Sequence, residues 1–144
     1  GAETFIADLP NPTILPQATG LDPEGLQEVT DRVTAYNGSL RAHATDHANV
    51  HVVPLAAEAQ VIADEGVLIA DELITADMLG GLLSLDGVHF SDIGYAFTAN
   101  VFLREINAAL DTDAPMVDLE AVVAASALSP SAIAAAGRDP EACR

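Results

Sequence analysis

The sequence contains no lysine and no tryptophan, and its only cysteine is Cys143. A single cysteine cannot close an internal disulfide, and it says little about the redox compartment. Five arginines stand against 22 acidic residues, which gives a formal net charge of −17. Because phosphate groups would be repelled by this charge, nucleic acid and anionic membranes are excluded as electrostatically driven partners.

Long hydrophobic runs are also missing. No apolar stretch approaches the roughly 18 residues that a membrane span needs, and no basic segment precedes an apolar one as in a signal peptide. Half of the 144 residues are nevertheless apolar, which is enough for one domain with a core of Ala, Val, Leu and Ile. The chain opens on "GAETFIADLP" without an initiator methionine, which indicates a processed or truncated piece.

The first half of the chain alternates between strand and helix patterns. The run Thr4 to Pro10 reads as a buried strand, and a proline-rich loop follows it. Asp22 is the expected N-cap of a helix that runs to about Asp46, and Val50 to Leu55 is a second apolar strand. The helix carries an apolar face at three- and four-residue spacing, formed by Leu26, Val29, Val33, Tyr36 and Leu40.

The second half is mainly helical in pattern. The segment Ala56 to Gly81 predicts one or two short helices or loops, and Ser91 is the expected N-cap of a helix from Asp92 to about Leu110. We therefore divide the chain into a main region, residues 1–110, and an alanine-rich helical tail, residues 111–144, that is interrupted at Ser129-Pro130. Alternating strands and helices predict an α/β fold with a parallel sheet. Two strands are too few for such a sheet, which indicates part of a larger domain.

Asp86 and His89 form the first candidate site, in the sequence "LDGVHF". A histidine that acts as a base needs an acceptor at Nδ1, which sets the tautomer and stabilises the imidazolium. A carboxylate three residues earlier, across a glycine turn, can supply that acceptor. The spacing alone does not show that the pair is catalytic. An aspartate three residues before a histidine is common, and an ordinary acidic turn explains it.

The residues around this pair favour a catalytic pair over an ordinary acidic turn. The segment "LLSLDGVHFSDIGYAFTANVFLREIN" resembles the last conserved block of the SGNH hydrolases, the GDSL-type esterases and lipases. Their pattern is D-G-x-H, then usually proline, a polar residue, a Gly-Tyr pair and an apolar helix. Gly94 and Tyr95 fit this frame, whereas Phe90 stands at the usual proline. Upstream, "TFIADLPNPTILP" is similar to the strand and loop after the third block of the family, and "APMVDLEAV" is similar to a segment after the last helix.

The resemblance implies a fold and a mechanism. The fold would be part of a three-layer α/β/α flavodoxin-like sandwich with a parallel sheet, and its N-terminal half would be missing. His89 would be the general base and Asp86 its orienting acid in a serine ester hydrolase that acts on an ester or lipid without any metal or organic cofactor. The family's Gly-Asp-Ser block and its oxyanion donors do not occur in this chain. The nucleophile is therefore expected on the missing N-terminal half, which would be the partner of this chain.

Two other functions stay open at this point. The chain could be a non-catalytic fragment, or a subunit that docks on a partner chain. It could also be an acidic metal-binding module, because His43 and His47 are spaced to share a metal on a helix and Asp46 could add an oxygen. His51 is expected on the following strand and would point elsewhere. Exposed histidines near a helix C-terminus are the simpler interpretation.

Overall fold

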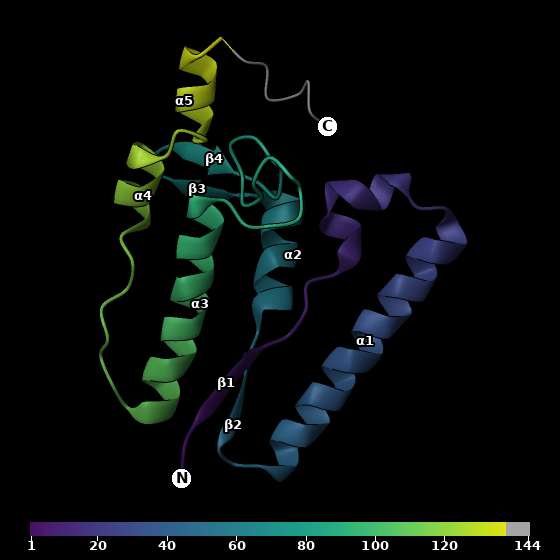
Figure 1. Ribbon diagram of the computed structural model, residues 1–144. Coiled ribbons are helices and arrows are strands. Elements are labelled where there is room, and N and C mark those ends of the chain that lie inside the picture. The colour runs from purple at the N-terminus through teal and green to yellow at the C-terminus, as the bar shows by residue number, and fades with distance from the viewer. Residues whose placement is uncertain (138–144) are drawn as a thin grey trace.

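The computed structural model describes residues 1–137. It combines helices with two small two-stranded sheets, so the chain is a mixed α/β protein (Figure 1). The strands are β1 (Thr4–Ala7), β2 (Val50–Val53), β3 (Val67–Ile69) and β4 (Glu72–Ile74). The α-helices are α1 (Pro23–Asp46), α2 (Leu55–Glu65), α3 (Asp92–Leu110), α4 (Leu119–Ala125) and α5 (Pro130–Ala135), and two short 3-10 helices, η1 (Pro12–Ile14) and η2 (Pro16–Gly20), follow β1.

Strands β1 and β2 pair in parallel, in a register that joins Thr4 to Val50 and Ala7 to Val53. Parallel neighbours need a crossover connection, and α1 provides it. The first turn of α1 is capped as its sequence predicts, because the Asp22 carboxylate accepts a hydrogen bond from the amide of Gly25 at 2.8 Å. The predicted strand, helix, strand order with parallel pairing is confirmed for this part of the chain.

The β3–β4 hairpin was not anticipated from the sequence. Helix α2 matches the expectation of a short helix between Ala56 and Gly81, but the residues after it form antiparallel strands. The turn between these strands holds Ala70 and Asp71 at φ angles of +52° and +64°. Turns of this kind usually carry Asn-Gly or Asp-Gly, so an alanine at the first position removes the signal by which such hairpins are recognised.

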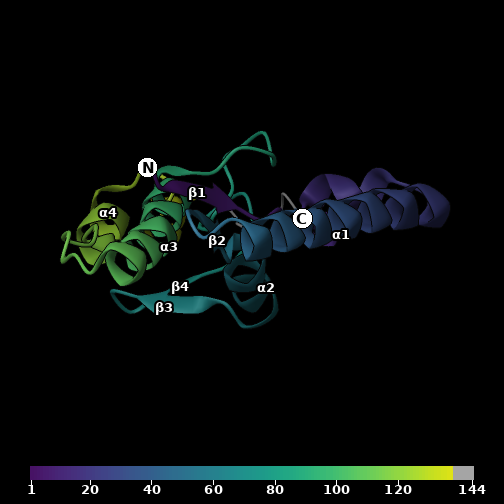
Figure 2. The same cartoon turned by 90° about the horizontal axis from the view of Figure 1, so that it is seen from below.

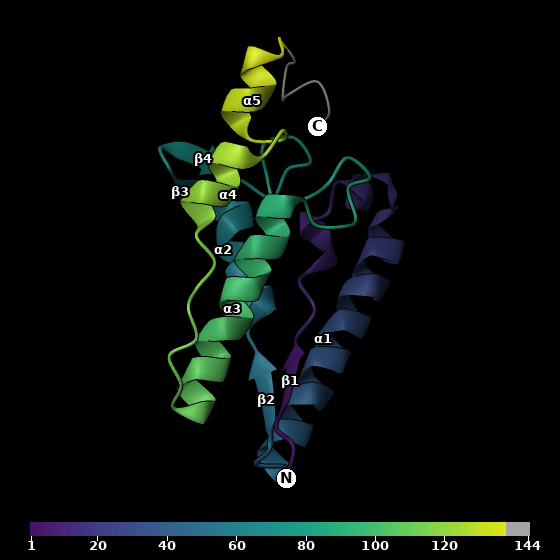
Figure 3. The same cartoon turned by 60° about the vertical axis from the view of Figure 1, so that its left-hand side comes forward.

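Helix α3 contributes its N-terminal half to the core. Ile93, Phe97 and Val101 are buried on it, and Val123 of α4 joins the same cluster. The Asn100 side chain bonds both backbone groups of Val117, at 2.7 and 2.9 Å, so the segment before α4 is fixed along α3. Figure 3 shows α4 beside one end of α3, with α5 beyond it. The described part of the tail, residues 111–137, therefore packs onto the main body.

Helix α1 is less well buried than its sequence pattern suggests. Of the apolar face predicted for it, Val29 and Tyr36 are exposed, and Asn37 is the only buried residue of the helix. Figure 2 shows α1 extending away from α3 and α4 on the opposite side of the β1–β2 pair.

No helix within residues 1–137 is long and apolar enough to cross a membrane.

A polar cluster fixes the chain where it leaves β1. Asp8 is only 1% exposed. Its carboxylate accepts a hydrogen bond from the amide of Ala56, in the first turn of α2, at 2.7 Å and pairs with the guanidinium of Arg41 on α1. The side-chain amide of Asn37 fixes Leu9, the residue after Asp8. It accepts from the N–H of Leu9 at 2.9 Å and donates to the carbonyl of Leu9 at 2.8 Å. This cluster ties β1 to both α1 and α2.

We expect Asp8→Ala to lower the free energy of unfolding by about 3 kcal/mol, because it leaves a helix N-terminal amide and an arginine without their buried acceptor. Urea unfolding followed by circular dichroism measures this loss. Asp31→Ala is the matched control, since Asp31 is an exposed carboxylate on α1. It should change stability by less than about 0.5 kcal/mol. Equal effects of the two substitutions would contradict the structural role of Asp8.

Candidate functional site

The candidate site lies on a tight loop between Leu82 and Ser91, which we call the site loop. The amide of Ser91 donates to the carbonyl of Leu82, and the amide of Ser84 donates to the carbonyl of His89, both at 2.8 Å. At the tip of the loop Gly87 adopts a φ of +68°, a left-handed conformation that favours glycine. The Asp-Gly step of the sequence motif is thus a backbone requirement of the turn.

The end of the site loop is fixed to the start of α3. The Ser91 hydroxyl donates to the carbonyl of Gly81 at 2.8 Å and accepts from the amide of Gly94 at 3.0 Å, which confirms Ser91 as the predicted N-cap. Gly94 packs so closely on the loop that a Cβ atom there would stand 2.1 Å from the carbonyl oxygen of Leu82. The Ser and Gly of the motif therefore hold the helix against the loop.

Asp86 is the centre of the hydrogen bonding in the site loop. Its Oδ2 atom lies 2.6 Å from Nδ1 of His89. Its Oδ1 atom accepts from the Ser84 hydroxyl at 2.7 Å and from the amides of His89 and Val88 at 2.9 and 3.0 Å. The carboxylate is thus held in one orientation by groups of its own loop.

This bonding favours the ionised carboxylate. The hydrogen bond from the His89 ring is the largest cause that lowers the pKa of Asp86 well below its ordinary value, followed by the Val88 amide, the Ser84 hydroxyl and the His89 amide. Because an ionised carboxylate only accepts, the facing Nδ1 atom carries the hydrogen, and Nε2 is left as the basic nitrogen.

We expect Asp86 to remain ionised at about pH 3, where an ordinary aspartate is mostly protonated. A folded-state pKa below the unfolded one contributes stability that is present above about pH 4 and is lost as pH falls through the folded pKa. A carboxyl-carbon NMR titration measures the ionisation directly. In His89→Ala the pKa of Asp86 should rise toward the ordinary value. A titration that is unchanged by this substitution would contradict the assigned cause.

The His89 ring is open to approach. Its side chain is 71% exposed and that of Asp86 is 52% exposed, and within residues 1–137 only Nδ1 of the ring has a hydrogen-bond partner. The pair can therefore take up and release a proton at Nε2 from a group that comes from outside the loop. This is the arrangement that the motif predicts for a base and its orienting acid.

Two supporting residues were missed in the sequence. Ser84 bonds Asp86 as described, and Gln17 of η2 donates from Nε2 to the backbone carbonyl of Asp86 at 2.7 Å. Gln17 is 69 positions away, so no local pattern indicates this contact. A hydroxyl two residues before the aspartate was the available signal for Ser84. The Gln17 bond ties the segment after β1 to the site loop.

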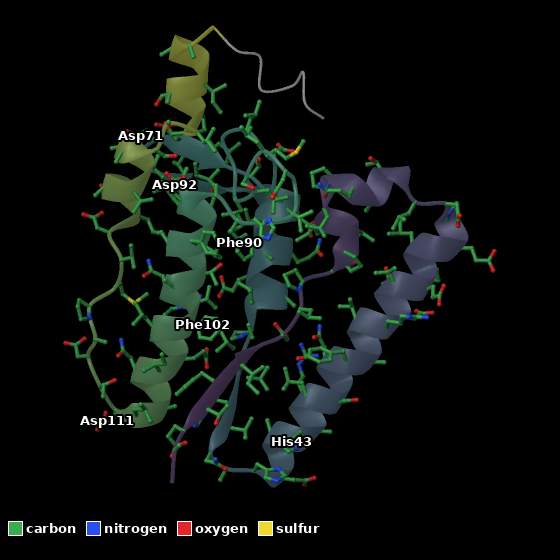
Figure 4. All side chains as sticks on the ribbon, viewed as in Figure 1. His43, Asp71, Phe90, Asp92, Phe102 and Asp111 are labelled. Atoms are coloured by element: carbon green, nitrogen blue, oxygen red, sulfur yellow. The ribbon has the colours of Figure 1, made fainter. Side chains whose placement is uncertain are left out.

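An apolar cavity of about 280 Å³ lies between these two segments. Among its thirteen lining residues only Asn11 has a polar side chain, and none is charged. Val88 and Phe90, which flank His89 in the sequence, both line it, and Figure 4 labels Phe90. The rest of the lining comes from the segment after β1, from α1 and α2, from Ala76 and from the start of the site loop, and includes Leu9, Ile14, Val33, Ala59 and Leu83.

No serine of this chain faces the free nitrogen of His89. All six serines lie among residues 1–137. Ser84 donates to Asp86 and Ser91 to Gly81, as given above. The other four are engaged elsewhere, in contacts of Ser39 with Ala35, Ser126 with Asp92, Ser129 with Ser131, and Ser131 with Glu72. The structure thus brings the predicted base and acid together without a serine partner from the same chain.

The other histidines lie apart from this site. The rings of His43 and His47 stack with centroids 4.0 Å apart near the end of α1, and Figure 4 shows His43 far from Phe90. His51 lies on β2 as expected, where it stacks on Phe5 and contacts Glu3 at 2.9 Å. In the part of the chain that the structure describes, no three histidine, cysteine or acidic side chains gather as a metal site would require. Cys143 lies outside the described residues.

Comparisons of the chain with protein-family models, with curated proteins and with solved structures find no match.

Proposed function

We propose that this chain carries the base and the orienting acid of a serine ester hydrolase of SGNH type, and that a polypeptide segment outside the 144 residues supplies the serine. The observation that supports this proposal is the 2.6 Å contact between His89 Nδ1 and Asp86 Oδ2. Three further donors hold the carboxylate in place, and Nε2 has no hydrogen-bond partner within residues 1–137. A purely structural acidic turn needs the backbone bonds to Asp86 but has no need of the ring contact.

The proposed reaction proceeds through an acyl-enzyme. Nε2 of His89 removes the proton of the serine hydroxyl while the serine oxygen attacks the ester carbonyl, and Asp86 stabilises the imidazolium that forms. The imidazolium then protonates the leaving alcohol. In the second half, His89 takes a proton from water, the hydroxide attacks the acyl group, and the carboxylic acid leaves as the serine recovers its proton from His89. The chemistry uses only protein side chains and water.

A flavodoxin-like sandwich is the fold that we propose for the complete domain. The parallel β1–α1–β2 unit is the repeating unit of a flavodoxin-like sandwich, and in the described chain β1 has a strand partner only in β2. A two-stranded parallel sheet is smaller than the four to six strands that are usual. We propose that strands of the serine-supplying segment pair with the free edge of β1 and complete the three-layer sheet.

The test needs the serine-supplying segment. The coding sequence upstream of Gly1 should contain a Gly-Asp-Ser block. We call the polypeptide that contains both this block and the 144 residues the serine-complete polypeptide. This polypeptide should hydrolyse p-nitrophenyl butyrate, and a fluorophosphonate probe should label its serine. The 144-residue chain alone should do neither. Turnover by the chain alone that survives His89→Ala would contradict the proposal. Failure of every such polypeptide to turn over esters would favour a non-catalytic docking subunit.

A further inference from the structure

The apolar cavity beside the site loop is held open by polar contacts at its walls. On one side the Asn37 amide fixes both backbone groups of Leu9. On the other side the hydrogen bonds to Asp86 fix the site loop, and the Gln17 bond links the two walls at 2.7 Å. Apolar walls that do not touch each other lose dispersion contacts, so an open cavity of this kind is maintained only by its surroundings. The cavity is therefore preformed.

The lining of the cavity limits the chemistry of a ligand. Ala59, Leu82 and Leu83 are buried at its walls, whereas Leu9 and Val88 are exposed, and Val88 is 56% exposed. A polar or ionised group inside it would lose its hydration without gaining a partner. The volume of about 280 Å³ is just below the roughly 300–1,000 Å³ that holds drug-sized ligands, which suits a chain of a few carbon atoms.

The charge of the protein also limits which ligands can bind in the cavity. With a formal net charge of −17, the chain repels anions such as free fatty acids, but it does not repel neutral molecules. We propose that this cavity binds the short aliphatic chain of an uncharged carboxylic ester. The identity of the ester group rests on the proposed function, whereas the binding of an uncharged aliphatic chain rests on the cavity alone.

The cavity also has a defined relation to the candidate base. Val88 and Phe90 both line it, and they directly precede and follow His89. An aliphatic chain inside the cavity would leave its carbonyl group at the exposed Val88, the residue directly before His89. The cavity would then select the substrate by the length of its aliphatic chain, and the pair Asp86–His89 would act on the ester bond at the cavity mouth.

Binding can be measured on the 144-residue chain without any catalysis. We would titrate the methyl-labelled chain with methyl hexanoate and record intermolecular NOEs. The expected result is NOEs from the aliphatic chain to the methyl groups of Val88 and Leu83, with an affinity at least tenfold higher than that for the hexanoate anion. Equal affinity for ester and anion, or NOEs confined to residues outside the cavity, would overturn the proposal.

Two valines four residues apart on α1 provide a matched pair of variants. Val33 lines the cavity and Val29 does not. Val33→Trp should lower the affinity for methyl hexanoate at least tenfold, and Val29→Trp should leave it unchanged. If Val33→Trp fails to fold by circular dichroism, Val88→Trp replaces it, because Val88 is exposed and contributes only its amide to Asp86. Full affinity in both cavity variants would overturn the assignment.

The outcome separates this inference from the proposed function. Esterase activity of the serine-complete polypeptide that depends on His89, without methyl hexanoate binding in the cavity, would overturn the inference alone. Binding to the 144-residue chain without any ester turnover by the serine-complete polypeptide would support the cavity and overturn the function. Binding to the 144-residue chain that disappears in the serine-complete polypeptide would show that protein covers the cavity, and would also overturn the inference.

Discussion

Replacement of His89 by alanine should lower the kcat of the serine-complete polypeptide by a factor on the order of 10⁴. Without Nε2, no base removes the proton of the serine, and no acid protonates the leaving alcohol. The measurement is steady-state hydrolysis of p-nitrophenyl butyrate. KM should change little, because the His89 ring is not among the cavity-lining residues.

Asp86→Asn should cause a loss of similar size, since an amide donor facing Nδ1 favours the tautomer in which Nε2 carries the hydrogen. Ser84→Ala should cost less than about tenfold, because the His89 ring and two amides still hold the carboxylate. His43→Ala, on the far end of α1, is the control and should leave kcat unchanged. A loss in His43→Ala comparable with that in His89→Ala would contradict the assignment of the site.

Gly94→Ala should destabilise the protein by about 2 kcal/mol, although alanine is ordinarily better than glycine inside a helix by about 1 kcal/mol. The reason is the Cβ atom, which would stand 2.1 Å from the Leu82 carbonyl oxygen and 3.0 Å from Cβ of Phe90. A backbone carbonyl cannot rotate away as a flexible side chain can, so α3 and the site loop must separate. Thermal unfolding measures the loss of stability.

Gly38→Ala is the matched control for this prediction. Gly38 lies inside α1, and a Cβ atom there would meet nothing within 4 Å. The substitution should therefore stabilise the protein by about 0.5–1 kcal/mol, the opposite sign to Gly94→Ala. Gly94→Ala should also weaken the contact between Asp86 and His89, which a rise in the Asp86 pKa toward its ordinary value would report. Stabilisation by both substitutions would contradict the close packing of Gly94.

Local patterns in the sequence predicted the helices well. The caps Asp22 and Ser91 each accept a hydrogen bond from the amide three residues later, as capping residues do. Such contacts depend on neighbouring residues only, so they can be recognised without the fold. The hairpin after α2 was missed because its turn, at Ala70 and Asp71, lacks the residues that usually mark such turns.

The sequence by itself also determined the Asp86–His89 contact, because a glycine turn brings a carboxylate back to a ring only three residues away. Only the tertiary structure decided which side chains surround that contact. Gln17 reaches Asp86 from 69 residues away, and the cavity beside His89 is lined by five separate segments. Such contacts arise from the packing of elements that are distant in the sequence, and this packing leaves no local periodicity or motif by which it could be recognised.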